Sequence, residues 1–256
     1  IQISEIQANS SVPSGWLKEE YQTYSTDCSF DGTYFTDPRD ENVYKTINVN
    51  GKIWFAEDLR YDSELSYNPY YDEPQEGVFA NVGMYYPDDE DAIPDGWRIP
   101  TKEEWVDLFS HVGGSKFSGG NWYTGAANPL KSSNTSDWLS LCTGESNPGS
   151  DDIGFNAISY IWKYPNSFGG DYSSTDCNKD GRQQGVLWWS STAYSSGGSI
   201  VWWSYHISFT SNQGGITRSC SNDNSCGHIL EYSSSKESSG NDGIAGRKML
   251  RLVKED

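Results

Sequence analysis

A hairpin signal near residue 50 constrains the fold more than any other feature of the sequence. Asn50-Gly51 separates two short runs, Tyr44 to Val49 and Lys52 to Ala56, and the first run alternates with a period of two residues. Asn-Gly suits the two positive φ angles of the tight turn that joins antiparallel strands. Four later runs predict further strands: Gly185 to Ser190, Ile200 to Phe209, Ile229 to Tyr232 and Met249 to Val253.

One helix is predicted with similar clarity. Thr101 and Glu104 have the spacing of a capping box, with Thr101 as the N-cap and Glu104 reaching back to it. An apolar stripe at helical spacing follows: Trp105, Leu108, Phe109 and Val112. Gly113-Gly114 ends this helix, and Asn121 to Lys131 predicts a second one. The expected fold class is therefore α+β, with short, mostly antiparallel strands, one or two helices and long irregular loops.

Charge and composition exclude several classes of partner. The chain of 256 residues carries 18 Lys+Arg against 36 Asp+Glu, a net charge of −18, which argues against nucleic acid and against a polybasic membrane anchor. Its 11 Trp and 17 Tyr favour a folded chain over a disordered one. No apolar run reaches the roughly 18 residues of a membrane span. Since the chain begins at Ile1, we expect removal of a signal peptide and an extracellular or bacterial cell-surface location.

The five cysteines predict at most two disulfides. Cys220 and Cys226 enclose a five-residue loop and are expected to pair with each other. The pairing of Cys28, Cys142 and Cys177 stays open, and the odd count leaves one thiol free or paired between chains.

Five motifs follow one another between Thr33 and Asp256. They are Asp37 to Asp40 with Gly51 to Leu59, Pro94 to Glu104-Trp105, Asp152 to Ala157, Trp188 to Thr192, and Leu250 to Lys254. Together they resemble the Fibrobacter succinogenes major paralogous domain, a family found on secreted and surface proteins of Bacteroidetes and Fibrobacteres. We therefore expect the domain to span residues 33–256, preceded by an extension over residues 1–32 with a strand at Ile1 to Ile6.

The resemblance implies a C-type-lectin-like fold, which is shared with formylglycine-generating enzymes. In that fold the N- and C-terminal strands pair, a helix packs beneath them, and a long loop region forms the ligand surface. Ile93 and Leu252 stand where many family members have cysteines, so a buried apolar contact is expected in place of a disulfide.

Strand alternation and loop composition select the candidate ligand surface, which spans Thr192 to Tyr232. Adjacent strand residues face opposite sides, so one of Trp202 and Trp203 is expected on an outer face with Tyr205. By the same argument Trp188 and Trp189 are not expected to point inward together. The predicted ligand-binding residues are Tyr194, Trp203, Tyr205, Asn212, Asn222, Asp223 and Asn224. Ser, Asn, Tyr and Gly crowd Thr192 to Gly246, a composition suited to hypervariable ligand binding.

Clustered carboxylates give two alternative calcium sites, Asp88-Asp89-Glu90-Asp91 and Asp151-Asp152, because calcium takes six to eight oxygen ligands. A solvated acidic surface is the other interpretation of both. The predicted function is a non-enzymatic recognition or adhesion domain for a glycan or a surface protein. One alternative is a structural subunit of a surface fibre that self-associates. The other is a divergent copper-dependent cysteine oxidase built on Cys220 and Cys226, although the Arg-Gly-Gly-Ser run of that enzyme family is missing.

Overall fold

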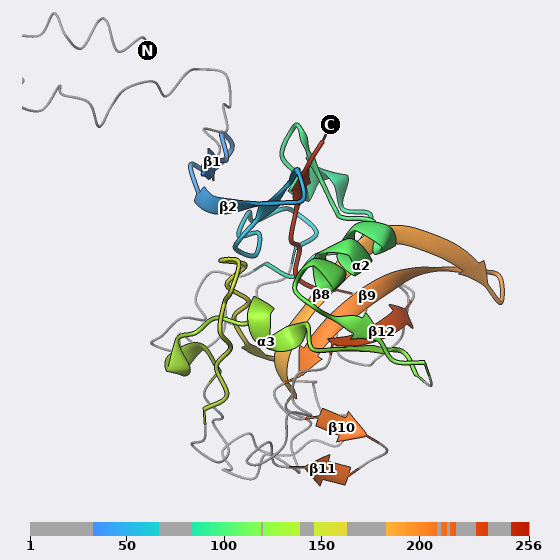
Figure 1. Cartoon of the computed structure of the whole chain (residues 1–256). Helices are drawn as coiled ribbons and strands as arrows, with labels where there is room; N and C mark the ends of the chain where they lie inside the picture. Colours follow the sequence, from blue (N-terminus) through green and yellow to red (C-terminus); the bar gives the residue numbers. More distant parts are fainter. Residues whose placement is uncertain are drawn as a thin grey trace, which may run out of the picture.

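The structure is a computed structural model in which two main sheets and one long helix enclose the core (Figure 1). It describes residues 33–66, 83–118, 120–138, 146–162, 183–208, 211–213, 216–218, 229–234 and 247–255. The sheets pair mostly antiparallel strands, so the predicted α+β class is confirmed. No helix among these residues is long and apolar enough to cross a membrane.

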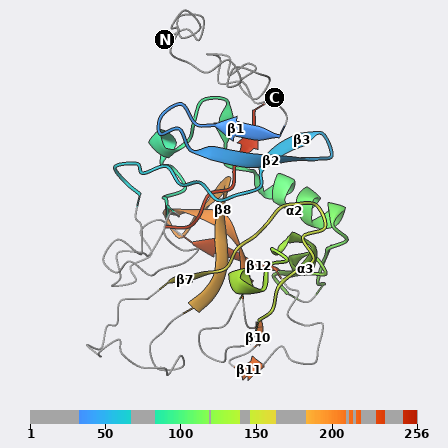
Figure 2. The same cartoon turned by 90° about the vertical axis from the view of Figure 1, so that its left-hand side faces the viewer.

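The first sheet contains the predicted hairpin. Its five strands have the order β1-β2-β3-β13-β4, with bounds Tyr34–Thr36, Val43–Val49, Lys52–Phe55, Val253–Lys254 and Trp97–Arg98. Asn50 and Gly51 have φ angles of 53° and 86°, as a tight two-residue hairpin requires. The C-terminal strand β13 pairs with β3 and β4, so both ends of the described chain share one sheet (Figure 2).

The second sheet has six strands in the order β5-β6-β12-β9-β8-β7. Their bounds are Ser115–Lys116, Trp122–Thr124, Ile229–Ser234, Ser199–Ser208, Gln183–Ser196 and Tyr160–Trp162. The β8–β9 hairpin, orange in Figure 1, turns at Gly197-Gly198, whose φ angles of 59° and 88° require glycine-like freedom. A separate two-stranded sheet joins β10 (Ser211–Gln213) and β11 (Ile216–Arg218).

The main helix, α2 (Lys102–His111), begins at the predicted capping box. The Thr101 side chain accepts the backbone N–H of Glu104, and the Glu104 carboxylate accepts the backbone N–H of Thr101. Three shorter helical elements also occur among the described residues: η1 (Glu90–Ala92), α3 (Ala127–Leu130) and η2 (Thr135–Trp138).

The helix predicted over Asn121 to Lys131 is wrong in its first half. Trp122–Thr124 forms β6, which pairs with β12, because two aromatic residues extend the sheet there. Gly125 then adopts a φ angle of 83°, which no right-handed helix contains. Within the predicted range, only α3 is helical.

Two clusters of buried side chains form the core. Core A lies against α2 and includes Trp54, Trp105, Trp188 and Tyr205, whereas core B includes Tyr44, Phe55, Trp97, Trp189 and Leu252. The expectation for Trp188 and Trp189 is wrong, because both are fully buried. The two side chains lie on different sides of β8. Trp188 is buried in core A and Trp189 in core B. Leu252 lies in core B and the half-buried Ile93 packs against the same cluster, so both are apolar members of one region, whereas their direct contact stays a prediction.

The capping box predicts a loss of stability in acid. Burial opposes ionisation of Glu104, but hydrogen bonds from Arg98 and Thr101 outweigh it and lower the pKa to about 2 from 4.5. This stabilisation is therefore complete above about pH 4.5 and is lost as pH falls through about 2. Between about pH 4.5 and pH 2 the unfolding free energy of both proteins is expected to fall. In urea denaturation, this fall should be about 1–2 kcal/mol smaller for Glu104→Gln than for the wild type. Parallel curves for the two proteins would contradict this, and Glu103→Gln is the exposed control.

Candidate functional site

Several aromatic and charged side chains meet where the second sheet passes the N-terminus of α2. The strand register pairs Tyr194 with Val201, Trp203 with Ser233, and Tyr205 with Glu231. Because residues two apart on a strand share a face, these side chains occupy the side of the sheet that faces α2. We call this region the Tyr194 surface and define it by six residues: Lys102, Lys116, Tyr194, Trp203, Glu231 and Ser233.

The aromatic part of the Tyr194 surface is a tilted pair of rings. The Tyr194 and Trp203 ring centroids lie 5.4 Å apart at 34°. Tyr194 is 40% exposed, and its hydroxyl is hydrogen-bonded to the Ser233 hydroxyl at 2.8 Å. The Lys102 ammonium lies 3.2 Å from the centroid of the Trp203 ring, a close cation–π contact. Tyr194 therefore offers the accessible ring, and Trp203 supports it.

Glu231 forms the polar base of the Tyr194 surface. Its two carboxylate oxygens lie 2.6 Å from the Lys102 ammonium and 2.7 Å from the Lys116 ammonium, and its side chain is fully buried. Burial alone would raise the pKa of Glu231, but the two lysines outweigh burial and hold this pKa below its ordinary value. Glu231 is thus an ionised carboxylate that fixes both ammonium groups.

Two tyrosine hydroxyls lie near the same carboxylate. Burial and the neighbouring Glu231 charge raise the pKa of Tyr123 to about 12, and the same two causes raise the pKa of Tyr205 further. Both phenols are therefore neutral at physiological pH. The arrangement offers an exposed aromatic ring for stacking and two ammonium groups for donating hydrogen bonds.

The structure brings together two of the seven predicted ligand-binding residues, Tyr194 and Trp203. The expectation that Tyr205 is exposed is wrong: Tyr205 lies in core A, where its ring packs against Phe109 and Trp105. Trp202 and Trp203 are both half-buried, because Trp202 packs against core B on the opposite side of β9. Asn212 belongs to β10, and Asn222, Asp223 and Asn224 lie outside the described residues.

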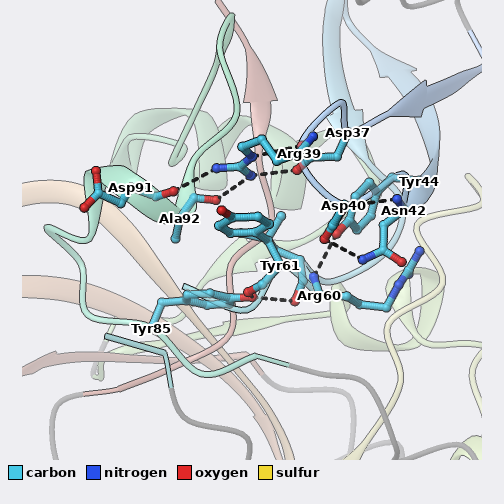
Figure 3. Close-up of polar contacts among 11 residues, drawn as sticks. Asp37, Arg39, Asp40, Asn42, Tyr44, Arg60, Tyr61, Tyr85, Asp91 and Ala92 are labelled. Atoms are coloured by element: carbon cyan, nitrogen blue, oxygen red, sulfur yellow. Dashed lines mark hydrogen bonds and ion pairs between the residues drawn. The ribbon is translucent and has the colours of Figure 1, made fainter. Parts of the chain in front are cut away.

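An arginine forms hydrogen bonds with the backbone at the end of the acidic run Asp88 to Asp91. The Arg39 guanidinium forms two hydrogen bonds with the Asp37 carboxylate and donates to the backbone oxygens of Asp91 and Ala92 at 2.8 and 2.9 Å (Figure 3). It also stacks 3.7 Å from the centroid of the Tyr61 ring. One backbone oxygen of the predicted calcium run, that of Asp91, and the backbone oxygen of the next residue are thus bound to a cation of the protein itself.

The carboxylates of the two calcium candidates do not converge. Asp89 is buried and accepts from the Ser63 hydroxyl, whereas its neighbours Asp88, Glu90 and Asp91 are exposed. Asp151 accepts the backbone N–H of Asn156, while Asp152 is exposed. Among the described ranges, no group of three or more His, Cys, Asp or Glu could hold a metal ion.

Some predictions fall on parts of the chain that are not described. All five cysteines, Cys28, Cys142, Cys177, Cys220 and Cys226, lie outside the described residues, as does the strand expected at Ile1 to Ile6. The Cys220–Cys226 disulfide therefore stays a prediction.

Sequence reasoning missed the charged half of the Tyr194 surface. One signal was present: Glu231 lies two residues after Ile229, so strand alternation puts a carboxylate on the same inward face as an apolar residue. The two lysines gave no such signal, because Lys102 and Lys116 come from α2 and β5. Only the tertiary arrangement places both ammonium groups at one carboxylate of β12, with Lys102 coming from α2 and Lys116 from β5, which is separated from β12 by β6.

Fold and site together define an α+β domain with two mostly antiparallel sheets and an aromatic surface flanked by lysines. The chain belongs to the Fibrobacter succinogenes major domain family, as the motifs predicted, and the family model (Fib_succ_major) matches residues 47–226. Strands β1, β12 and β13 lie outside the matched range but pair with strands inside it. No curated protein and no solved structure matches the chain.

Proposed function

We propose that this protein is a non-enzymatic recognition or adhesion domain, secreted or displayed on a bacterial surface, that binds a glycan through the Tyr194 surface. The observation that carries the proposal is the Tyr194 ring, exposed and held in place by Trp203 and by the Ser233 hydroxyl. A fixed, exposed aromatic ring stacks on the apolar face of a sugar with little loss of side-chain entropy.

We also propose that the fold is C-type-lectin-like. Two features support this: the C-terminal strand β13 lies in the same sheet as β1 and β2, and α2 packs on core A between the two sheets. In this proposal the Tyr194 surface belongs to the long β8–β9 hairpin and its neighbour β12, within the region from Thr192 to Tyr232.

The test is a glycan-array screen of the purified chain, run with calcium and again with a chelator. For any glycan that binds, we expect Tyr194→Ala to weaken binding about tenfold through the loss of stacking. Tyr232→Ala is the matched control, since Tyr232 is 47% exposed but lies on the opposite side of the sheet from Glu231.

Chelation is expected to leave the binding intact, because the proposed contacts involve a ring and ammonium groups. If binding is lost only with the chelator, the Tyr194 surface is not the site. If no glycan binds, the glycan proposal is wrong. Concentration-dependent self-association in size-exclusion chromatography would then favour the structural-subunit alternative.

A further inference from the structure

The two lysines of the Tyr194 surface stay accessible although they share one carboxylate. The Lys102 side chain is 23% exposed and the Lys116 side chain 47%, whereas the Glu231 side chain between them is fully buried. A ligand at this surface therefore meets the ammonium groups and does not reach the carboxylate. The buried charge positions the lysines without competing for the ligand.

Both ammonium groups retain capacity for hydrogen bonds. A lysine ammonium has three donors. Lys102 forms an ion pair with Glu231 and lies over the Trp203 ring, and Lys116 donates one hydrogen bond to Glu231. The Lys102 ammonium and the exposed Tyr194 ring both contact the Trp203 ring, and Lys116 is linked to this group through the Glu231 carboxylate.

The electrostatic setting is unusual for this chain. The net charge is −18, yet the accessible charged groups of the Tyr194 surface are two cations. The acid next to them on α2 is the exposed Glu103, whose charge acts on Tyr205 of the same region. Removing the Glu103 charge would therefore make the surface more cationic.

We propose that the Tyr194 surface selects glycans with an anionic group, a carboxylate or a sulfate, bound by Lys102 and Lys116 while the sugar ring stacks on Tyr194. This rests on the proposed glycan-binding function and adds the class of ligand. Ammonium groups bind both kinds of anion, so the chemistry that is recognised is the negative charge on a sugar.

The experiment compares each anionic probe with a neutral partner by calorimetry. The probes are an oligogalacturonate with its methyl ester, and a sulfated galactan oligosaccharide with its desulfated form. At least one anionic probe should bind about tenfold more tightly than its neutral partner, and added NaCl should reduce this difference.

Three substitutions make the test specific to these residues. Lys116→Gln should remove most of the preference for the anionic probe, while Lys45→Gln, at an exposed lysine on β2, should leave it unchanged. Glu103→Gln should strengthen binding of the anionic probe, which a purely structural role for the lysines would not produce.

The outcomes separate this inference from the proposed function. If anionic and neutral probes bind equally and Tyr194→Ala weakens both, the inference is wrong and the recognition function stands. An anionic preference that is unchanged in Lys116→Gln also overturns it. If none of the four probes binds at millimolar concentration, the inference is overturned, and the glycan array decides the proposed function separately.

Discussion

Replacing Arg251 with Met is expected to destabilise the protein by about 3–5 kcal/mol, because it leaves a buried carboxylate without its counter-ion. The Arg251 and Asp58 side chains are each 1% exposed, and the Arg251 Nε lies 2.6 Å from the Asp58 carboxylate. Arg251 also donates to the backbone oxygens of Phe155 and Asn156. The substitution therefore removes the donors of three acceptors at once.

The remaining contact of Asp58 does not compensate for this loss. The Trp188 indole N–H donates to the same Asp58 oxygen at 2.7 Å, but an indole carries no charge. We expect Asp58→Asn combined with Arg251→Met to recover part of the stability, because the double variant buries no net charge.

Urea denaturation followed by far-UV circular dichroism measures both variants. Arg247→Met, at a half-buried arginine that donates to the backbone oxygen of Leu65, is the control and should change the unfolding free energy by about 1 kcal/mol or less. A change below about 1 kcal/mol in Arg251→Met would show that the buried pair is not needed for stability.

The second large effect is expected for Trp105→Ala, at about 3–5 kcal/mol of lost stability. Trp105 is fully buried at the point where α2 meets both sheets. Its ring is stacked on Trp188 at 5.4 Å and meets Trp54 edge-on at 5.2 Å, and its indole N–H donates to the backbone oxygen of Trp189. Removing the indole leaves a cavity between α2 and the strands of both sheets.

The same denaturation experiment tests this prediction. Phe117→Ala removes a ring that is 46% exposed and is expected to cost about 1 kcal/mol or less. Trp105→Phe should fall between the two, because it keeps most of the apolar volume and loses the N–H donor. Equal stability of Trp105→Ala and Phe117→Ala would contradict the central position of Trp105 in core A.

The candidate site was predicted only in its aromatic part. Tyr194 and Trp203 were found because strand alternation and polar loop composition act over a few residues. Tyr205 was placed wrongly by the same rule, since alternation tells which residues share a face and not which face is covered. Here α2 covers the side of β9 that carries Tyr205, through Trp105 and Phe109.

The sequence by itself determined the features with local causes. The hairpin at Asn50-Gly51 follows from two residues that tolerate positive φ, and the start of α2 follows from the reciprocal hydrogen bonds of Thr101 and Glu104. Family membership also followed from sequence, because it depends on motif order along the chain.

Only the tertiary structure decided which groups meet. Glu231 and Lys116 are separated by 115 residues, and Arg251 and Asp58 by 193. Burial of Trp188 and Trp189 on opposite sides of one strand likewise depends on two clusters assembled from distant segments. Such contacts arise from packing of the sheets and α2 against one another, and a local pattern carries no information on that packing.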